Sequence, residues 1–462
     1  MAYAIKRSLV SEENVLIIRK MLVLQPKTKN NKYNRDKSTE PIIFYHLEDD
    51  ILHLPYIFAG SLFKITPNVD IKYPNTLLTF NGTLRDYQVA VEAEAWQQLS
   101  NFGTTTLGLY PGFGKTILGA CLAARAKLLT VIMVHREILA GQWKKTFLDN
   151  TNAKVWIVGE KDIPSTCDVI ICMDTRWMNI PKEMRDAVGF LIIDEAHAFC
   201  TPSRVGALLA FHPLYTVIES GSLARDDGME DMIYALAGTH GVFRESNKPF
   251  SITKVITGVK PERKMNRMQG VDYLHLQRTT LFNERRNNII IDLVIRNLKN
   301  KILILTALKD HAMLLYNTLT EIGVSCDFLC GGKKGYHDSN VLIGTISKIG
   351  TGFDPATSCP DYKGSPFDLL LVVSSIKKED MLIQNIGRIF RADFPSVLHF
   401  VDDDDIYKSH WYAARKWYLS RNGTISEYKC PTDTPDVKAI QEQWLAEQVK
   451  QHKKLTLNVI KK

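Results

Sequence analysis

Five consecutive residues, Gly112-Phe113-Gly114-Lys115-Thr116, have the types and spacing of a phosphate-binding turn. An apolar run over 105–109 precedes them and an Ala- and Leu-rich stretch over 117–126 follows, so we expect a strand, a turn and a helix. In that context the glycines let backbone N–H groups close around phosphate oxygens, and the helix N-terminus favours negative charge. Lys115 would reach the β- and γ-phosphates of a nucleoside triphosphate, and the Thr116 hydroxyl would hold Mg²⁺. The residues expected to contact the nucleotide here are Pro111, Gly112, Phe113, Gly114, Lys115 and Thr116.

One position of this turn departs from the full phosphate-loop pattern, which expects a glycine where the chain has Leu109. A glycine-rich turn without a ligand is therefore the alternative interpretation. Gln88, further upstream, could contact a nucleotide base with its two-sided amide, although a surface glutamine is the default expectation.

A second chemical group is Asp194-Glu195-Ala196-His197, which follows the apolar run 190–193. Asp194 at the end of a strand can hold Mg²⁺, commonly through water, and Glu195 can orient and deprotonate an attacking water. An acidic turn between a strand and a loop is the alternative. Together with Lys115 and Thr116, these carboxylates predict a site for triphosphate hydrolysis.

A third group lies near the end of the chain, on a helix predicted over 380–390. Gln384, Gly387, Arg388 and Arg391 are spaced at i, i+3, i+4 and i+7, so they would share one face. Two guanidinium groups presented to a γ-phosphate would neutralise the charge that develops during its transfer. A solvated basic face is the alternative.

The elements that must position these groups alternate between apolar strands and helices. Continuous apolar runs such as 128–134 are typical of parallel strands covered on both faces. The first alternating region predicts a doubly wound parallel sheet, whose ligands bind at the carboxyl ends of the strands. A second such region begins near 281 and has no phosphate loop of its own. Two such sheets suggest a two-lobed motor with ATP in the cleft between the lobes.

Length and composition are those of an ordinary globular protein. The 462 residues, 45% hydrophobic and 23% charged, are enough for two or three domains, and no apolar run is long enough to span a membrane. Eight scattered cysteines without zinc spacing, and no secretory signal, indicate an intracellular protein with reduced thiols. The net charge of +8 permits a polyanionic partner without requiring one.

We predict an accessory α+β domain over 1–75, lobes over 76–270 and 271–430, and a basic helical tail over 431–462. The basic run 27–37 is expected to be a loop, with a solvated surface favoured over phosphate contact. Cations and aromatic rings interleave between Tyr407 and Tyr418, a pattern that suits stacking on single-stranded nucleic acid and helix packing equally well.

The chain resembles superfamily 2 helicases of the DEAH-box type, within them the XPB-like group, and most of all the poxvirus-type transcript-release helicases of large DNA viruses. The resemblance covers roughly 80–430. Its motifs are an entry motif at 84–88, motif I at 112–116, motif Ia around His135-Arg136 and Gln142-Trp143, motif II at 194–197, motif V at 345–354 and motif VI at 384–391. Motif III departs from the usual Ser-Ala-Thr-Pro, because the chain reads Ser220-Gly221-Ser222-Leu223.

The resemblance implies two tandem RecA-like doubly wound parallel-sheet lobes that hydrolyse ATP with Mg²⁺. Lys115, Asp194, Glu195, Arg388 and Arg391 would be catalytic, with Asp354, Gln384 and Gln88 among the nucleotide contacts. The implied partners are single-stranded or duplex DNA, with RNA or an RNA–DNA hybrid as further candidates, and the transcription machinery in a host cytoplasm or virion. A translocase that separates no strands, and a catalytically silent nucleic-acid-binding scaffold, remain alternatives.

Overall fold

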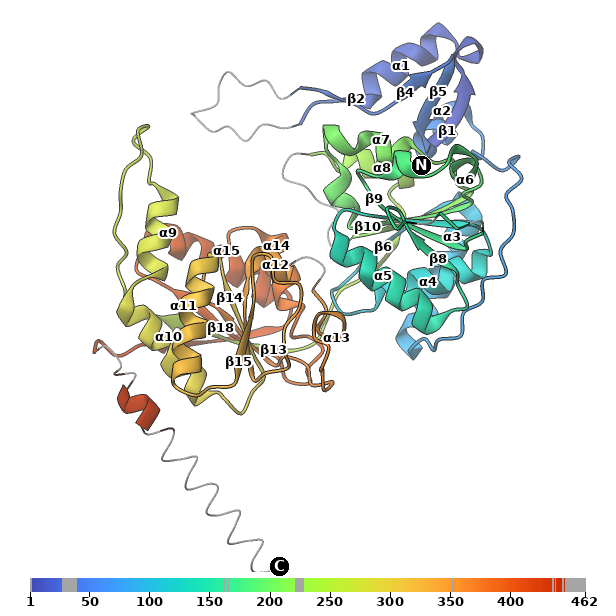
Figure 1. Ribbon diagram of the computed structural model, residues 1–462. Coiled ribbons are helices and arrows are strands. Elements are labelled where there is room, and N and C mark those ends of the chain that lie inside the picture. The colour runs from blue at the N-terminus through green and yellow to red at the C-terminus, as the bar shows by residue number, and fades with distance from the viewer. Residues whose placement is uncertain are drawn as a thin grey trace, which may run out of the picture. The chain divides into compact units, whose positions relative to one another are not determined.

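The protein is described here from a computed structural model, which describes residues 2–26, 40–161, 163–164, 166–220, 228–350, 353–433, 436, 438–442 and 444. Three predicted features lie wholly or partly outside these residues: the basic loop at 27–37, most of motif III, and most of the basic tail. The same holds for Thr351 and Gly352 of motif V. The chain forms two compact units, Met1–Glu245 and Ser246–Lys462 (Figure 1).

The first unit begins with a small α+β region, as predicted. Its antiparallel sheet has the strand order β1-β5-β4, and the Ser11 side chain caps its helix α1 by accepting a hydrogen bond from Asn14 N. Residues of this region share one hydrophobic core with the rest of the unit. Its elements are β1 (Ala2–Lys6), α1 (Glu12–Leu22), β2 (Val23–Leu24), β3 (Ile42–Ile43), β4 (His46–Glu48), β5 (Ile51–Pro55) and α2 (Tyr56–Phe63).

A seven-stranded parallel sheet forms the centre of the first unit, in the order β12-β6-β11-β10-β7-β9-β8. The helices α3, α4 and α5 contribute to the core on one face, and the N-terminal region with α7 and α8 contributes to the core on the other. The strands are β6 (Thr104–Leu109), β7 (Thr130–Val134), β8 (Val155–Ile157), β9 (Val169–Met173), β10 (Phe190–Asp194), β11 (Tyr215–Glu219) and β12 (Val242–Arg244). The helices are α3 (Asp86–Phe102), α4 (Lys115–Ala126), α5 (Glu137–Asn150), α6 (Lys182–Asp186), α7 (Val205–Leu209) and α8 (Asp231–Ala237).

The second unit repeats this plan with another seven-stranded parallel sheet, in the order β15-β16-β14-β17-β18-β13-β19. Its strands are β13 (Phe250–Ile256), β14 (Ile302–Thr306), β15 (Cys326–Leu329), β16 (Val341–Thr345), β17 (Leu369–Val372), β18 (Ser396–Val401) and β19 (Gly423–Lys429). Its helices are α9 (Tyr273–Leu281), α10 (Glu284–Arg296), α11 (Lys309–Glu321), α12 (Ile346–Gly350), α13 (Pro355–Ser358), α14 (Glu379–Ile386) and α15 (Asp405–Ser420).

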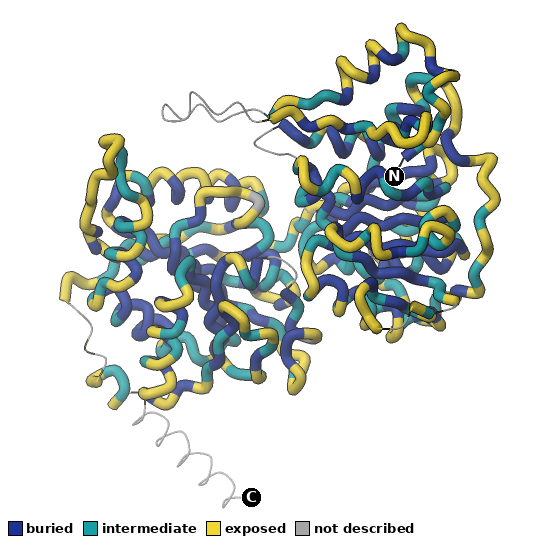
Figure 2. Tube along the Cα trace, turned by 45° about the horizontal axis from the view of Figure 1, so that its top comes forward, coloured by how far each residue is buried: buried dark blue, intermediate teal, exposed yellow. Residues whose placement is uncertain are grey.

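The central strands of both sheets are buried on both faces, which explains the continuous apolar runs in their sequences (Figure 2). The predicted fold class, two doubly wound parallel sheets of the RecA-like type, is confirmed. The division between the units differs from the predicted boundary at 270. It lies at Glu245, because β13 adds its strand to the second sheet between β18 and β19.

Candidate nucleotide-binding site

The turn between β6 and α4 has the backbone geometry of a phosphate loop. Gly112 and Gly114 have φ values of 88° and 99°, in the left-handed region that favours glycine. Lys115 is the first residue of α4, and its Nζ donates to the Leu109 carbonyl oxygen at 3.3 Å. Leu109 itself is buried in the core, so the residue that departs from the glycine pattern fills space beneath the loop.

Gln88, which lies on α3, contacts this loop through its side chain. Its amide is buried, accepts a hydrogen bond from Arg85 N at 2.9 Å, and donates to the Phe113 carbonyl oxygen at 2.8 Å. A Cβ on Gly114 would lie 2.4 Å from Gln88 Nε2, so glycine is needed there for close approach as well as for its φ. The surface-glutamine alternative is therefore wrong, and contact of Gln88 with a base stays a prediction.

The carboxylates of motif II lie at the end of β10. Asp194 is buried, and its Oδ2 accepts a hydrogen bond from Trp143 Nε1 of α5 at 2.9 Å. Burial, with the neighbouring Glu195 charge, raises the pKa of Asp194 to about 6, although Trp143 and Lys115 act in the opposite direction. A cation near Asp194 would oppose both effects and favour the ionised carboxylate.

Glu195 follows in a left-handed conformation, with φ of 53°, which turns the chain sharply at the strand end. Its Oε2 lies 3.4 Å from His197 Nδ1, and that ring nitrogen is also 3.0 Å from Ser220 Oγ. His197 thus contacts both Glu195 of motif II and Ser220, the first hydroxyl of the motif III region.

A third carboxylate, Glu219, ends the neighbouring strand β11. In the parallel register Asp194 is the partner of Glu219, and β11 lies between β10 and the β6 strand that leads into the phosphate loop. Glu219 is buried, and burial together with Asp194 raises its pKa well above the usual range. Sequence reasoning missed this residue, although the mostly apolar stretch 215–218 that ends in a carboxylate is similar to the pattern of 190–194.

These donors fit magnesium held together with a nucleotide. The described residues contain no group of three or more His, Cys, Asp or Glu side chains that could hold a metal ion alone. Mg²⁺ usually keeps several waters and is bound by one or two protein oxygens plus substrate phosphates. The Thr116 hydroxyl after the loop and the Asp194 carboxylate are the oxygens predicted for that role.

The second unit brings the predicted motif V and motif VI residues together, but not on one helix face. The helix α14 ends at Ile386, so Arg388 and Arg391 lie in the turn that follows it and the prediction of a helix to 390 is wrong. Arg388 donates to the carbonyl oxygens of Phe353 and Gly350, both at 2.7 Å. These tertiary contacts hold the turn together with backbone hydrogen bonds from Arg388 N to the Asn385 carbonyl oxygen and from Ile389 N to the Ile386 carbonyl oxygen.

Arg391 forms an ion pair with Asp354, with 2.7 Å between Nη1 and Oδ1. Gln384 lies close to the same segment, since a Cβ on Gly350 would be 3.9 Å from its Oε1. The predicted residues Gln384, Arg388 and Arg391 therefore lie close to Gly350, Phe353 and the fourth predicted residue, Asp354. The alternative of a solvated basic face does not hold for Arg388, whose partly buried guanidinium donates to two carbonyl oxygens, whereas Arg391 is exposed.

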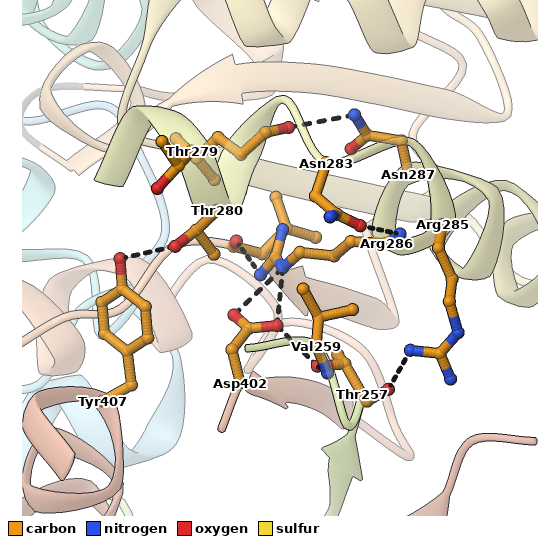
Figure 3. Close-up of polar contacts among 12 residues, drawn as sticks. Thr257, Val259, Thr279, Thr280, Asn283, Arg285, Arg286, Asn287, Asp402 and Tyr407 are labelled. Atoms are coloured by element: carbon orange, nitrogen blue, oxygen red, sulfur yellow. Dashed lines mark hydrogen bonds and ion pairs between the residues drawn. The ribbon is translucent and has the colours of Figure 1, made fainter. Parts of the chain in front are cut away.

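A buried polar network joins the start of α10 to the sheet of the second unit (Figure 3). Arg286 donates through Nε to both carboxylate oxygens of Asp402, at 2.9 and 3.0 Å, and through Nη2 to the Val373 carbonyl oxygen at 2.6 Å. Asp402 also accepts from Thr257 Oγ1 at 2.6 Å. The guanidinium thereby connects the carboxyl ends of β17, β18 and β13.

The aromatic residues near the end of the chain are part of the core. Trp411, Trp417 and Tyr418 of α15 are buried in the hydrophobic cluster of the second unit, so helix packing and not base stacking accounts for them. All eight cysteines are unbridged. Among the described residues, no helix has both the length and the apolar character needed to cross a membrane.

The fold and the predicted site residues resemble those of one class of protein. A parallel sheet carrying a phosphate loop and a carboxylate pair, followed by a second such sheet with an arginine turn, is the plan of a superfamily 2 helicase. Residues 81–218 match the family model described as "Type III restriction enzyme, res subunit". In fold, the chain is similar to the solved structure "S. cerevisiae Dbp5 bound to RNA and ADP BeF3", with a TM-score of 0.51, 13% identity and coverage of 77% of this chain and 92% of that one.

Among helicases, the chain resembles those of large DNA viruses. It is 28% identical over 429 residues to a protein named as a helicase, 161L of Invertebrate iridescent virus 6, covering 86% of this chain and 94% of that protein. It is also 22% identical over 389 residues to the transcript termination protein A18 of Yaba-like disease virus, covering 76% and 78% respectively. These similarities support a viral superfamily 2 helicase.

Proposed function

We propose that this protein is an ATP-dependent helicase that couples ATP hydrolysis to movement along DNA and to strand separation during viral transcription. The observation that carries the proposal is the arrangement at the carboxyl edge of the first sheet. There Lys115 begins the helix after β6, and Asp194 and Glu195 lie at the end of β10, two strands away in the same sheet. No other described part of the chain combines a glycine turn, a lysine and a carboxylate pair in this way.

Each residue of the site has a distinct part in the proposed reaction. Lys115 and the backbone N–H groups of the loop bind the β- and γ-phosphates, which orients the terminal phosphate for in-line attack. Thr116 and Asp194 hold Mg²⁺, which when bound neutralises charge on the phosphate oxygens. Glu195 orients the attacking water and accepts its proton. Trp143 keeps the Asp194 carboxylate in place.

The arginine cluster of the second unit is proposed to complete the site. Arg388 and Arg391 would approach the γ-phosphate when the two lobes close, and would stabilise the charge of the transition state. Arg388 contacts Gly350 and Phe353, and Arg391 contacts Asp354, so motif V and motif VI would move together. Hydrolysis would then release the lobes, and repeated closure would advance the protein along a strand.

The relatives support a nucleic-acid substrate and a place in transcription. A18 is named for transcript termination, and the Dbp5 structure contains RNA. We place DNA first for this chain because of its resemblance to the viral DNA helicases, with RNA or a hybrid as the competing substrate. Contacts would go mainly to phosphates, so binding should tolerate any sequence and weaken with salt.

The test is ATPase activity measured without nucleic acid and with single-stranded DNA, duplex DNA or RNA. Lys115→Ala should abolish turnover, while Lys154→Ala, which alters an exposed lysine of the same unit, should leave it unchanged. Glu195→Gln should bind ATP but hydrolyse it slowly. Arg388→Ala should lower turnover on the order of 10³-fold, as expected for an arginine that stabilises transferred phosphate.

Strand separation needs its own measurement. Displacement of a labelled strand from a tailed duplex, dependent on ATP and lost in Lys115→Ala, supports a helicase. DNA-stimulated hydrolysis without displacement would indicate a translocase instead. Normal turnover in Lys115→Ala, or no ATPase activity with any nucleic acid, would refute the proposal.

A further inference from the structure

Glu219 is a buried carboxylate that the proposed reaction leaves unused. Its exposed fraction is 1%, and among the described residues neither of its carboxylate oxygens has a hydrogen-bond partner. A buried polar group without a partner is costly, and a charged one more so. Nothing in the packing of an apolar strand requires a glutamate at this position, so its presence calls for a chemical explanation.

The carboxylate points towards the helix that carries the phosphate loop. A Cβ built on Gly119 of α4 would lie 2.9 Å from Glu219 Oε1 and 2.7 Å from Trp143 Cη2. Trp143 in turn donates to Asp194, whose backbone is the register partner of Glu219. Glu219 therefore lies below α4 and beside Asp194, in the layer that supports the nucleotide site.

The acidic neighbours of Glu219 outnumber its basic ones. Asp194 and Glu195 act on it as like charges, and Lys115 is the cation that acts on it. Burial and these like charges disfavour the ionised form of Glu219 in the protein alone, which is why its pKa is raised. A divalent cation bound with the nucleotide would reverse that balance, and a carboxylate within several ångströms would strengthen its binding.

We propose that Glu219 is a positioning residue of the metal–nucleotide site, a third carboxylate that acts through Asp194 to raise the affinity for the divalent cation. This inference rests on the proposed function, since it takes the same edge of the sheet to be the nucleotide site. It assigns Glu219 no contact with the nucleotide, and it gives the residue a role that a neutral side chain of the same shape could not fill.

The experiment measures Mn²⁺ binding by electron paramagnetic resonance, with a non-hydrolysable ATP analogue present. Glu219→Gln keeps the shape and removes the charge, and we expect the dissociation constant for Mn²⁺ to rise on the order of 10-fold. Glu219→Asp keeps the charge and should recover much of the affinity. Glu183→Gln, which removes an exposed charge from the same unit, should have no effect.

Two outcomes would overturn the inference. One is a folded Glu219→Gln protein whose Mn²⁺ affinity lies within twofold of the parent, which would leave Glu219 a purely structural residue. The other is a parent protein that binds no Mn²⁺ with the analogue. A failure of the proposed function looks different, because a parent that binds Mn²⁺ but hydrolyses no ATP would still show the effect of the Glu219 charge.

Discussion

Arg286 offers a sharp test of how the second unit is held together. Its side chain is 1% exposed and that of its partner Asp402 is 4% exposed, so the ion pair lies away from water. Arg286→Met keeps much of the side-chain length but leaves Asp402 buried without its cation. Breaking a buried ion pair from one side usually costs about 3–5 kcal/mol.

That cost translates into a large change in thermal stability. For domains of this size, each kcal/mol shifts Tm by about 2–4 °C, so unfolding of the second unit should move down on the order of 10 °C. A matched control lies at the other end of the same helix. Arg296 pairs with Asp292 at 2.8 Å, but its side chain is 66% exposed, and Arg296→Ala should cost no more than about 0.5 kcal/mol.

The assay is thermal and urea unfolding of the full chain, with hydrogen exchange read over 246–433 to assign the transition. The double variant Arg286→Met with Asp402→Leu removes both charges, so its loss should be clearly smaller than the sum of the two single losses. If Arg286→Met destabilises the second unit no more than Arg296→Ala does, or if the double variant shows the full sum, the reasoning is refuted.

Three further predictions concern the first unit. Gly119→Ala should destabilise this unit by about 1–3 kcal/mol through overpacking, because the new Cβ would lie 2.7 Å from Trp143. Gly141→Ala should instead stabilise α5 by about 0.5–1 kcal/mol, because its new Cβ would have no atom within 4 Å. Urea unfolding of both variants checks this prediction. Trp143→Phe should lower ATP turnover while the fold persists, because Asp194 loses a hydrogen-bond donor, and a turnover equal to the parent's would contradict the role given to the indole. Acid should destabilise the unit, because burial lowers the pKa of His212 to about 3 and the unfolded chain therefore takes up the proton first as the pH falls below the ordinary value of 6.5. The stability lost is about 2 kcal/mol at pH 5, and His212→Gln should flatten the dependence of urea unfolding between about pH 7 and pH 5.

The sequence predicted best the elements whose signal is local. Continuous apolar runs marked β7 and β10 to within two residues, because strands buried on both faces carry that pattern wherever their partners lie. The strand β13 was missed as a member of the second sheet. Its pattern is only partly apolar, and its partners β18 and β19 begin at Ser396 and Gly423, far along the chain. The residues of one strand do not indicate which strand, so far along the chain, will pair with it.

For the candidate site, too, the sequence predicted the residues placed by local structure and missed the contacts made with distant parts of the chain. Spacing alone located Lys115, Asp194 and Glu195 on the right elements, because a loop between strand and helix is a local feature. Spacing failed for Arg388, whose guanidinium is held by the carbonyl oxygens of Gly350 and Phe353 and not placed by the helical period. The partners of Gln88 were equally invisible, since one of them is the backbone of a loop on another element.

Both sheets have buried carboxylates at their carboxyl edges, but the partners of these carboxylates differ between the two sheets. At the carboxyl edge of the second sheet, the buried Asp402 is neutralised by Arg286, which stabilises the architecture without any ligand. At the carboxyl edge of the first sheet, Asp194 has an indole donor and Glu219 has no hydrogen-bond partner among the described residues. Buried carboxylates left in that state are unfavourable in the protein alone and favourable once a cation arrives. These electrostatic differences support the proposed ligand site in the first unit and a structural role for the ion pair at the edge of the second.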